Sequence, residues 1–228
     1  MDGYLDLNAD LGEEVTDDEA LLTVVTSANV ACGYHAGSAA IMRSVCERAA
    51  ELRVSIGAQV SYDDRENFGR VARDVPFELL REQVSDQVGV LSAIASRAGT
   101  AVRYVKPHGA LYHRVIDDEE QAAAVLDGSG SLPVLGMPGA FLRAAEVAGR
   151  VVWHEGFPDR GYAADGRLVP RGRPGALVDD VATIAAQALA LAASVDSLCL
   201  HGDSPGAVDH ARAVRQALEA AGWSLRGL

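Results

Sequence analysis

Short apolar runs alternate along the chain with longer segments in which apolar residues recur every three or four positions. The short runs are typical of strands, and the longer spacing is typical of helices with one buried face. We predict seven strands, at residues 4–8, 28–32, 54–59, 101–106, 132–137, 151–154 and 197–201. Between them we predict seven helices, at residues 17–26, 39–53, 77–97, 118–126, 139–148, 179–193 and 205–221.

This alternation predicts an α/β fold with a parallel sheet and right-handed crossovers. An open sheet and a closed barrel both satisfy the pattern. Nearly every predicted strand is followed at once by a polar or glycine-rich stretch, which favours a barrel whose loops converge on one face. We therefore predict a single domain over residues 1–228, folded as an irregular seven-stranded (β/α) barrel. Residues 223–228 either add a last strand or pack against the bottom of the barrel.

The composition is that of a globular protein, with 49% hydrophobic and 23% charged residues. No apolar run approaches the ~20 residues that cross a bilayer, and the acidic first residues do not resemble a signal peptide, so we expect no membrane contact. Three cysteines without CxxC spacing predict buried thiols in a reducing cytoplasm. The net charge of -12 argues against nucleic acid as a partner, although a cleft on an acidic protein can be locally positive.

The basic residues are unevenly divided, because nineteen are arginine and one, Lys106, is lysine. Lysine is a compact charge that can lose its proton when it is desolvated. Lys106 ends an apolar run in the segment VKPHGALY, and His108 falls on the same side if the strand extends that far. A cation beside a histidine can bind an oxyanion while the histidine moves protons. We interpret Lys106 as a residue with a chemical role in the site, rather than as a lysine that is present by chance among the arginines.

The first two strands also end in polar residues. Asn8 and Asp10 lie two residues apart after the first strand, so both can point into one cavity. Glu13, in the same segment, also fits a turn and the start of a helix. Asn29 belongs to the second strand, in the segment SANVACGYHAG. We predict that Asn8 and Asn29 bind substrate or phosphate and that Asp10 is catalytic.

Two loops offer groups for binding an anion. Gly33 lets the backbone approach a ligand and exposes amide hydrogens. His35, between glycines, is a candidate general base, anion binder or metal ligand. Arg65 and Arg70 flank Phe68 in a charged loop, where they either form a solvated surface or clamp a carboxylate or phosphate.

The last two strands lead into further charged segments. The segment 155–171 shows no helical spacing over about fifteen residues. A charged segment of this length without regular structure indicates a functional loop or lid. Arg160 and Arg171 in this loop are candidate binding residues. His201 and Asp203 follow the last strand and are also candidates. A helix beginning at residues 204–205 adds free backbone amides, which favour an anion.

Several common nucleotide and hydrolase motifs are missing, namely GxxxxGK[ST], GxGxxG, GxSxG and HExxH. The segments that are present resemble the LamB/YcsF family. In chain order the matching blocks are DLNADLGE, SANVACGYHAG, DRENFGR, VKPHGALY, FPDRGYAADGRLVPR with PGAL, and LCLHGD. They span residues 6–203, and their number and order make the resemblance specific.

The resemblance implies a fold like the seven-stranded barrels of glycoside hydrolases and polysaccharide deacetylases. It also implies an activity, the ATP-dependent opening of 5-oxo-L-proline (pyroglutamate) to L-glutamate, with separate B and C subunits as partners. One departure concerns chemistry: where the family usually has GAHPSYPDR, this chain has GAQVSYDDR, so Gln59 replaces a histidine. Glutamine cannot ionise and is a poor metal ligand.

The lactam is a stabilised amide, and phosphorylation of its oxygen by ATP gives a good leaving group for attack by water. Such a site needs a cation for the phosphoryl group, a base for water and donors for the substrate carboxylate. We assign the first role to Lys106, the second to Asp10 or His108, and the third to Arg65, Arg70 or the amides near Gly33. ATP with Mg²⁺ is the expected cofactor, and no intrinsic metal site is predicted. Substitution Lys106→Met is expected to abolish turnover and leave the fold intact.

Two other functions fit the same residues. A metal-dependent deacetylase or amidohydrolase acting alone would use ligands from among Asp10, His35, His108 and His201, although Gln59 counts against it. It would hydrolyse its substrate without ATP. A non-catalytic subunit that binds a partner and a small ligand would tolerate the loss of these side chains.

Overall fold

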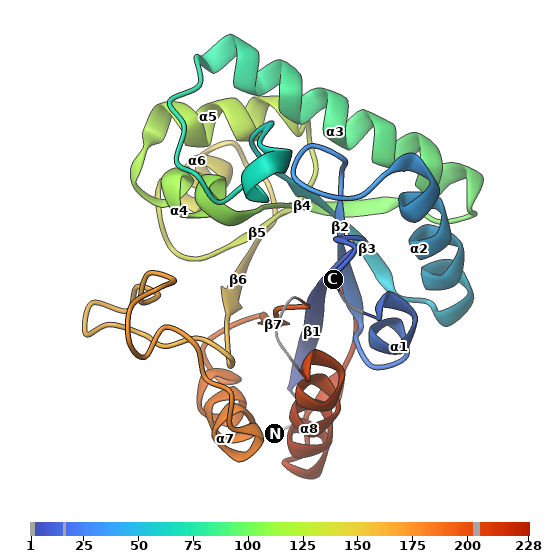
Figure 1. Cartoon of the computed structure of the whole chain (residues 1–228), viewed down its shortest axis with the longest axis vertical. Helices are drawn as coiled ribbons and strands as arrows, with labels where there is room; N and C mark the ends of the chain where they lie inside the picture. The colour runs from blue at the N-terminus through green and yellow to red at the C-terminus, as the bar shows by residue number, and fades with distance from the viewer. Residues whose placement is uncertain (1–2, 16, 203–205) are drawn as a thin grey trace.

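The computed structural model describes residues 3–15, 17–202 and 206–228. Seven parallel strands follow one another around a closed ring, which β1 completes by pairing with both β2 and β7 (Figure 1). The strands of the ring are β1 (Tyr4–Leu11), β2 (Ser27–Ala31), β3 (Ser55–Val60), β4 (Val102–Pro107), β5 (Val134–Gly136), β6 (Val152–Gly156) and β7 (Ser197–Leu200). The predicted seven-stranded barrel is therefore confirmed, and each predicted strand is present.

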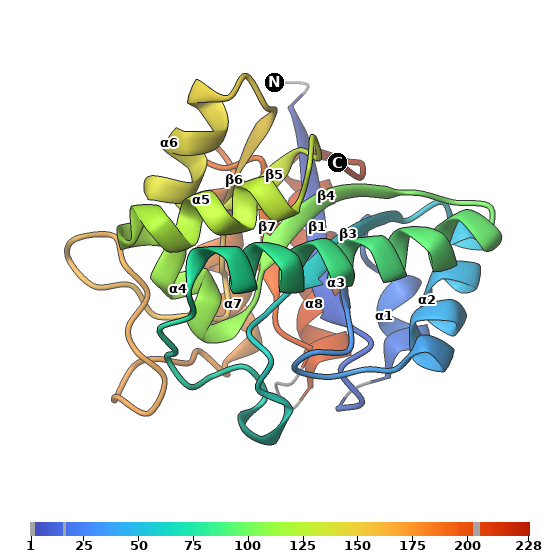
Figure 2. The same ribbon diagram turned by 90° about the horizontal axis from the view of Figure 1, so that it is seen from above.

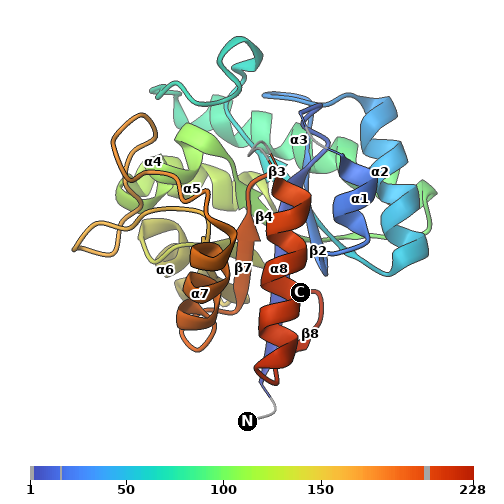
Figure 3. The ribbon, with the colours of Figure 1, turned by 60° about the horizontal axis from the view of Figure 1, so that its bottom comes forward.

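The C-terminal segment adds a short strand outside the ring. β8 (Ser224–Leu225) pairs in parallel with β1 at Tyr4 and Leu5. It lies beside the lower end of α8 in Figure 3. Of the two placements expected for residues 223–228, the extra strand is the one that forms.

The helices surround the strands, as Figures 1 and 2 show. Those predicted are α1 (Asp18–Leu22), α2 (Ala39–Leu52), α3 (Phe77–Arg97), α5 (Glu119–Gly128), α6 (Ala140–Val147), α7 (Val181–Leu191) and α8 (Ala207–Ala220). A turn of 3-10 helix, η1 (Arg65–Asn67), and one further helix, α4 (Gly109–Asp117), were not predicted. α4 starts directly after β4. Pro107 and Gly109 at this junction are typical of a turn or loop, so the sequence did not indicate the start of a helix there. None of the described helices combines the length and the apolar character needed to span a bilayer.

Alternation along β1 sorts its side chains between two environments. Leu5, Leu7, Ala9 and Leu11 belong to the main hydrophobic core, which the helices share. The intervening residues, Asp6, Asn8 and Asp10, point into the barrel, because neighbouring side chains of a strand lie on opposite faces. They are buried there and bond to side chains from the other strands. The interior of this barrel is therefore polar, whereas such barrels are usually filled by branched apolar residues.

Asp6 is a buried carboxylate, 2% exposed, and its ionisation is expected to make stability depend on pH. It accepts hydrogen bonds from Thr26 Oγ1 and Ser27 Oγ, both 2.7 Å long, and from Ser197 Oγ. Burial nevertheless raises the pKa of Asp6 from 3.8 to about 6. The folded state therefore binds a proton more tightly than the unfolded chain, and stability is lost as the pH rises through this window. Over the whole window the unfolding free energy falls by about 3 kcal/mol, and roughly half of this loss occurs above pH 5.

The measurement is the free energy of unfolding in urea between pH 5 and pH 8, for the wild type and for Asp6→Asn. The variant loses one hydrogen bond at every pH, so it shifts the curve by a constant amount. Relative to the variant, the wild type is expected to lose stability as the pH rises. Parallel curves for the two proteins would show that Asp6 does not titrate in this range.

Candidate active site

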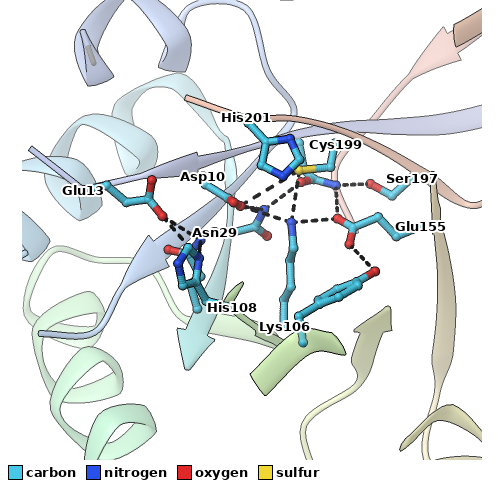
Figure 4. A network of polar contacts seen from close by, with 12 residues as sticks. Asp10, Glu13, Asn29, Lys106, His108, Glu155, Ser197, Cys199 and His201 are labelled. Atoms are coloured by element: carbon cyan, nitrogen blue, oxygen red, sulfur yellow. Dashed lines mark hydrogen bonds and ion pairs between the residues drawn. The ribbon is translucent and has the colours of Figure 1, made fainter. Parts of the chain in front are cut away.

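Lys106 lies at the centre of a buried ion cluster inside the barrel. Its Nζ is 3.1 Å from Asp10 Oδ1 and 2.9 Å from Glu155 Oε1 (Figure 4). The same nitrogen is 3.1 Å from Cys199 Sγ and lies 5.5 Å above the centre of the Phe157 ring. The side chains of Lys106, Asp10 and Glu155 are each at most 6% exposed, so the three charges are shielded from water.

The ion pairs keep Lys106 protonated. Burial alone would lower the pKa of Lys106, but the carboxylates of Asp10 and Glu155 outweigh it and hold this pKa well above its usual range. Burial would likewise raise the pKa of Asp10, and the ammonium of Lys106 holds it below its usual value instead. Lys106 is therefore a fixed ammonium, not the proton-losing lysine that desolvation alone would produce.

Two asparagines hold the carboxylates in place. Asn8 Nδ2 donates to Glu155 Oε1 over 3.1 Å and to Ser197 Oγ over 2.6 Å. Asn29 Nδ2 donates to Asp10 Oδ1 over 2.9 Å and to Asn8 Oδ1 over 2.6 Å. Both asparagines have no exposed surface. The structure thus places Asn8 and Asn29 beneath the ion cluster, where they orient it, rather than on a surface that a substrate touches.

A pocket opens above Lys106 at the carboxyl end of the strands. Its cationic lining consists of Lys106, Arg70, Arg160 and Arg171. Three histidines, His108, His113 and His201, line it as well. Among the described residues, Asp10 is the only carboxylate in the lining. A protein of net charge -12 thus carries a locally positive pocket, which favours a small anion.

The loop between β6 and α7 forms one wall of this pocket. Arg160 is 2% exposed, and its guanidinium donates to Ala176 O over 2.9 Å and to Val169 O over 2.8 Å. These bonds tie the two arms of the loop together. Arg160 therefore has a structural role besides lining the pocket, and Leu168 and Arg171 reach the pocket from the same loop.

The predicted arginine clamp does not form as one unit. Arg65 donates to Gly37 O over 2.7 Å and pairs with Glu14 at 2.9 Å, so it fastens the loop after β2. Arg70 lines the pocket, with its guanidinium 4.9 Å above the Phe68 ring. Only Arg70 of the two is placed to meet a ligand in this pocket.

The predicted amide donor at Gly33 is also engaged within its own loop. Gly33 has a φ of 92°, which favours glycine, and its N–H donates to Ala36 O over 2.9 Å. The neighbouring His35 turns inward and is 1% exposed. Its ring stacks on that of His108, with the ring centres 4.0 Å apart. The structure therefore brings His35 and His108 together, beside the pocket rather than around Lys106.

His108 is neutral, and both of its nitrogens are engaged. Nε2 lies 3.1 Å from Phe68 O, a carbonyl, so this nitrogen carries the hydrogen. Nδ1 lies 3.0 Å from Gln59 Nε2 and accepts its hydrogen. Burial and the adjacent His35 ring hold the pKa of His108 well below its usual value. This arrangement makes His108 less suited to the role of base than the sequence suggested.

A histidine and aspartate pair that was not predicted lies on the other side of the pocket. Asp159 Oδ2 accepts from the backbone N–H of His201 over 2.9 Å and lies 3.0 Å from His201 Nδ1. The His201 ring stacks on Phe157, with the ring centres 5.4 Å apart. A carboxylate at Nδ1 favours the tautomer whose Nε2 can accept a proton. His201 is therefore the better oriented base.

Three residues of the site were not predicted as site residues, and one predicted site residue is not among those that the structure describes. Glu155 and Asp159 were noted only as loop residues, and Tyr112, whose hydroxyl donates to Glu155 Oε2 over 3.0 Å, was not singled out. The position of Glu155 directly after an apolar strand, like that of Lys106, was the available signal. Asp203 falls within residues 203–205, which lie outside the described part of the chain, as does the predicted helix start.

Comparisons with known proteins agree over nearly the whole chain. A family model described as the LamB/YcsF family matches residues 5–228. A protein of Streptomyces avermitilis, named as the A subunit of 5-oxoprolinase, is 56% identical, covering 96% of this chain and 97% of that protein. One of the same name from Mycobacterium marinum is 48% identical, covering 98% of each.

Solved structures give the same result for the fold. The lactam utilization protein of Thermus thermophilus superposes with a TM-score of 0.92 at 34% identity, and all of both chains is covered. A family 4 carbohydrate esterase from Streptomyces lividans shares only the fold, with a TM-score of 0.55 and 10% identity over 99% of this chain and 92% of that one. From the family model and the curated relatives together, the chain belongs to the LamB/YcsF family.

Proposed function

We propose that this protein opens the ring of 5-oxo-L-proline to give L-glutamate, in a reaction coupled to ATP hydrolysis. It would act as the A subunit of a 5-oxoprolinase, together with B and C subunits. The relatives that are named as the A subunit of 5-oxoprolinase support this proposal, as does the structural likeness to a lactam utilization protein. The three cysteines are free, which is in keeping with a cytoplasmic enzyme.

The observation that carries the proposal is the buried ammonium of Lys106 at the base of a cationic pocket. The substrate carries a carboxylate, and phosphorylation of its amide oxygen adds a second anionic group. Transfer of the γ-phosphoryl group of Mg²⁺–ATP to that oxygen gives ADP and an imidate phosphate. Attack of one water on the same carbon and cleavage of the C–N bond give an acyl phosphate of glutamate, and a second water hydrolyses this acyl phosphate to glutamate and inorganic phosphate. Each of these steps develops negative charge that fixed cations stabilise.

The residues of the pocket fit separate parts of this reaction. We assign Lys106 to the oxygen that leaves with phosphate, and Arg70 and Arg171 to the substrate carboxylate. His201, oriented by Asp159, takes the proton of the attacking water. Asp10 lies beside Lys106 and fixes its ammonium, so the base role considered for Asp10 passes to His201.

The test is an assay of glutamate release from 5-oxoproline by the full chain, with and without ATP, Mg²⁺ and the B and C subunits. We expect release only when all of these are present. Release without ATP would overturn the proposal in favour of an amidohydrolase acting alone. Full activity of a complex in which this chain carries substitutions at Lys106 and His201 would instead indicate a non-catalytic binding subunit.

A further inference from the structure

Four buried polar side chains gather beside the pocket, each from the end of a different barrel strand. Glu13 follows β1, His35 follows β2, Gln59 belongs to β3 and His108 follows β4. Their exposed fractions are 5%, 1%, 0% and 6% respectively. Glu13 and His108 appear next to one another in Figure 4. The function proposed above assigns no chemistry to this cluster.

Several atoms of the cluster lack the hydrogen bonds that burial demands. Neither Nδ1 nor Nε2 of His35 has a hydrogen-bond partner, and Gln59 Oε1 has none either. Leaving a buried polar atom unpaired is costly because the atom loses its hydrogen bonds to water, and native proteins rarely tolerate it without a reason. An imidazole with an unpaired nitrogen, aimed at a carboxylate 3.5 Å away, indicates a ligand between the two.

The spacing of these atoms matches the ligands of a metal ion. Ligand atoms of Glu13, His35 and His108 all lie within 4.8 Å of one another. Glu13 Oε1 is 3.5 Å from His35 Nε2 and also 3.5 Å from His108 Nδ1. Ligands about 2.0–2.2 Å from a tetrahedral ion are about 3.3–3.6 Å apart. Two sides of the triangle therefore already have the required length.

Gln59 occupies the centre of the cluster with its amide nitrogen. Nε2 donates to Glu13 Oε1 over 2.9 Å and to His108 Nδ1 over 3.0 Å. These are the two atoms that would donate lone pairs to a cation, so the NH₂ group substitutes for one. A half-turn of the amide replaces Nε2 with Oε1 beside Glu13 Oε1 and His108 Nδ1, at about the separation of neighbouring ligands, and this oxygen has no partner to give up. Gln59 can thus fill the site without an ion or ligate the ion when it binds.

We propose that Glu13, His35 and His108 form a site for a divalent first-row transition ion such as Zn²⁺, with Gln59 Oε1 as a fourth ligand. Two imidazoles and two oxygens suit Zn²⁺ or Co²⁺ better than Mg²⁺ or Ca²⁺, which prefer oxygen ligands alone. The bond from His108 Nε2 to Phe68 O is the outer contact that typically fixes a metal-bound histidine with its other nitrogen available. The sequence alone predicted no metal site, because Gln59 stands where the family usually has a histidine.

The test uses the full chain freed of metal by a chelator, without ATP, substrate or partner subunits. Zn²⁺ binding is measured by titration calorimetry, and Co²⁺ binding by its visible absorption spectrum. We expect one ion per chain and a cobalt spectrum typical of low-coordinate nitrogen and oxygen ligation. His35→Ala and Glu13→Gln are each expected to weaken binding more than about 100-fold. His154→Ala is the matched control, because this exposed histidine pairs with Asp196 outside the cluster and its loss should change nothing.

Gln59→His gives the opposite prediction, since imidazole is a stronger ligand for Zn²⁺ than an amide oxygen. We expect this variant to bind Zn²⁺ at least about 10-fold more tightly than the wild type. The gain keeps the test decisive even if His35→Ala or Glu13→Gln fails to fold. Absence of stoichiometric binding in the wild type would overturn the proposal, as would binding that survives both His35→Ala and Glu13→Gln in folded protein. Either result would leave the oxoprolinase proposal intact, because its assay is separate.

Discussion

Replacing Lys106 with methionine is expected to remove nearly all lactam-opening activity and also to destabilise the fold. The substitution removes the ammonium that lies 3.1 Å from Asp10 and 2.9 Å from Glu155. Two carboxylates then remain buried without a countercharge, which typically costs roughly 3–5 kcal/mol of unfolding free energy. Activity should fall by roughly 10²–10³-fold, because the cation that stabilises the developing anion is lost. The sequence alone predicted an intact fold, and the two ion pairs change that expectation.

A second substitution separates the two effects. Adding Glu155→Gln to Lys106→Met removes one uncompensated carboxylate, so the double variant should recover at least about 1 kcal/mol of stability. Its activity should stay as low as that of the single variant. Urea denaturation measures the stability, and glutamate release by the assembled complex measures the activity. A Lys106→Met protein as stable as the wild type would show that the ion pairs contribute nothing. An active one would remove Lys106 from the mechanism.

The fold could be predicted because its information is local. Apolar runs of strand length alternate with helical spacing through the whole chain, and the seven strands of the ring fall within a few residues of their predicted bounds. α4 was missed because Pro107 and Gly109 suggest a loop at the point where the helix starts. The gap matters for the site, since α4 carries Tyr112 and His113 into the pocket.

The site could be predicted only in part because its contacts cross the barrel. Lys106 and Asp10 stood out by composition and strand position, yet nothing in the sequence showed that Glu155 would face the lysine. Asn8 and Glu155 are in contact although 147 positions apart, and closure of the ring decides this pairing. The charge of an arginine does not show which group it contacts, and this limits the prediction of anion ligands. Arg65 carries the charge expected of an anion ligand but directs it to Gly37 O and Glu14 within the scaffold.

His201 is the residue whose role the structure changes most, and we expect His201→Gln to lower kcat by roughly 10²–10⁴-fold with little change in KM. The physical reason is its tautomer. Asp159 accepts from the backbone N–H of His201 and faces Nδ1 at 3.0 Å, so Nδ1 holds the hydrogen and Nε2 is basic. Asp159→Asn can keep the backbone bond through its oxygen while its NH₂ group faces Nδ1. That reversal places the hydrogen on Nε2 and removes the base without removing the ring.

The chain provides a matched control for this substitution. His154 and Asp196 form the same kind of pair at an exposed position, with a backbone bond of 2.8 Å and 3.4 Å between Nδ1 and Oδ2. Asp196→Asn should therefore leave kcat unchanged, whereas Asp159→Asn should lower it nearly as far as His201→Gln. Steady-state kinetics of the assembled complex measures both variants. If Asp159→Asn and Asp196→Asn behave alike, the orientation of His201 does not limit the reaction, and another group must take the proton from water.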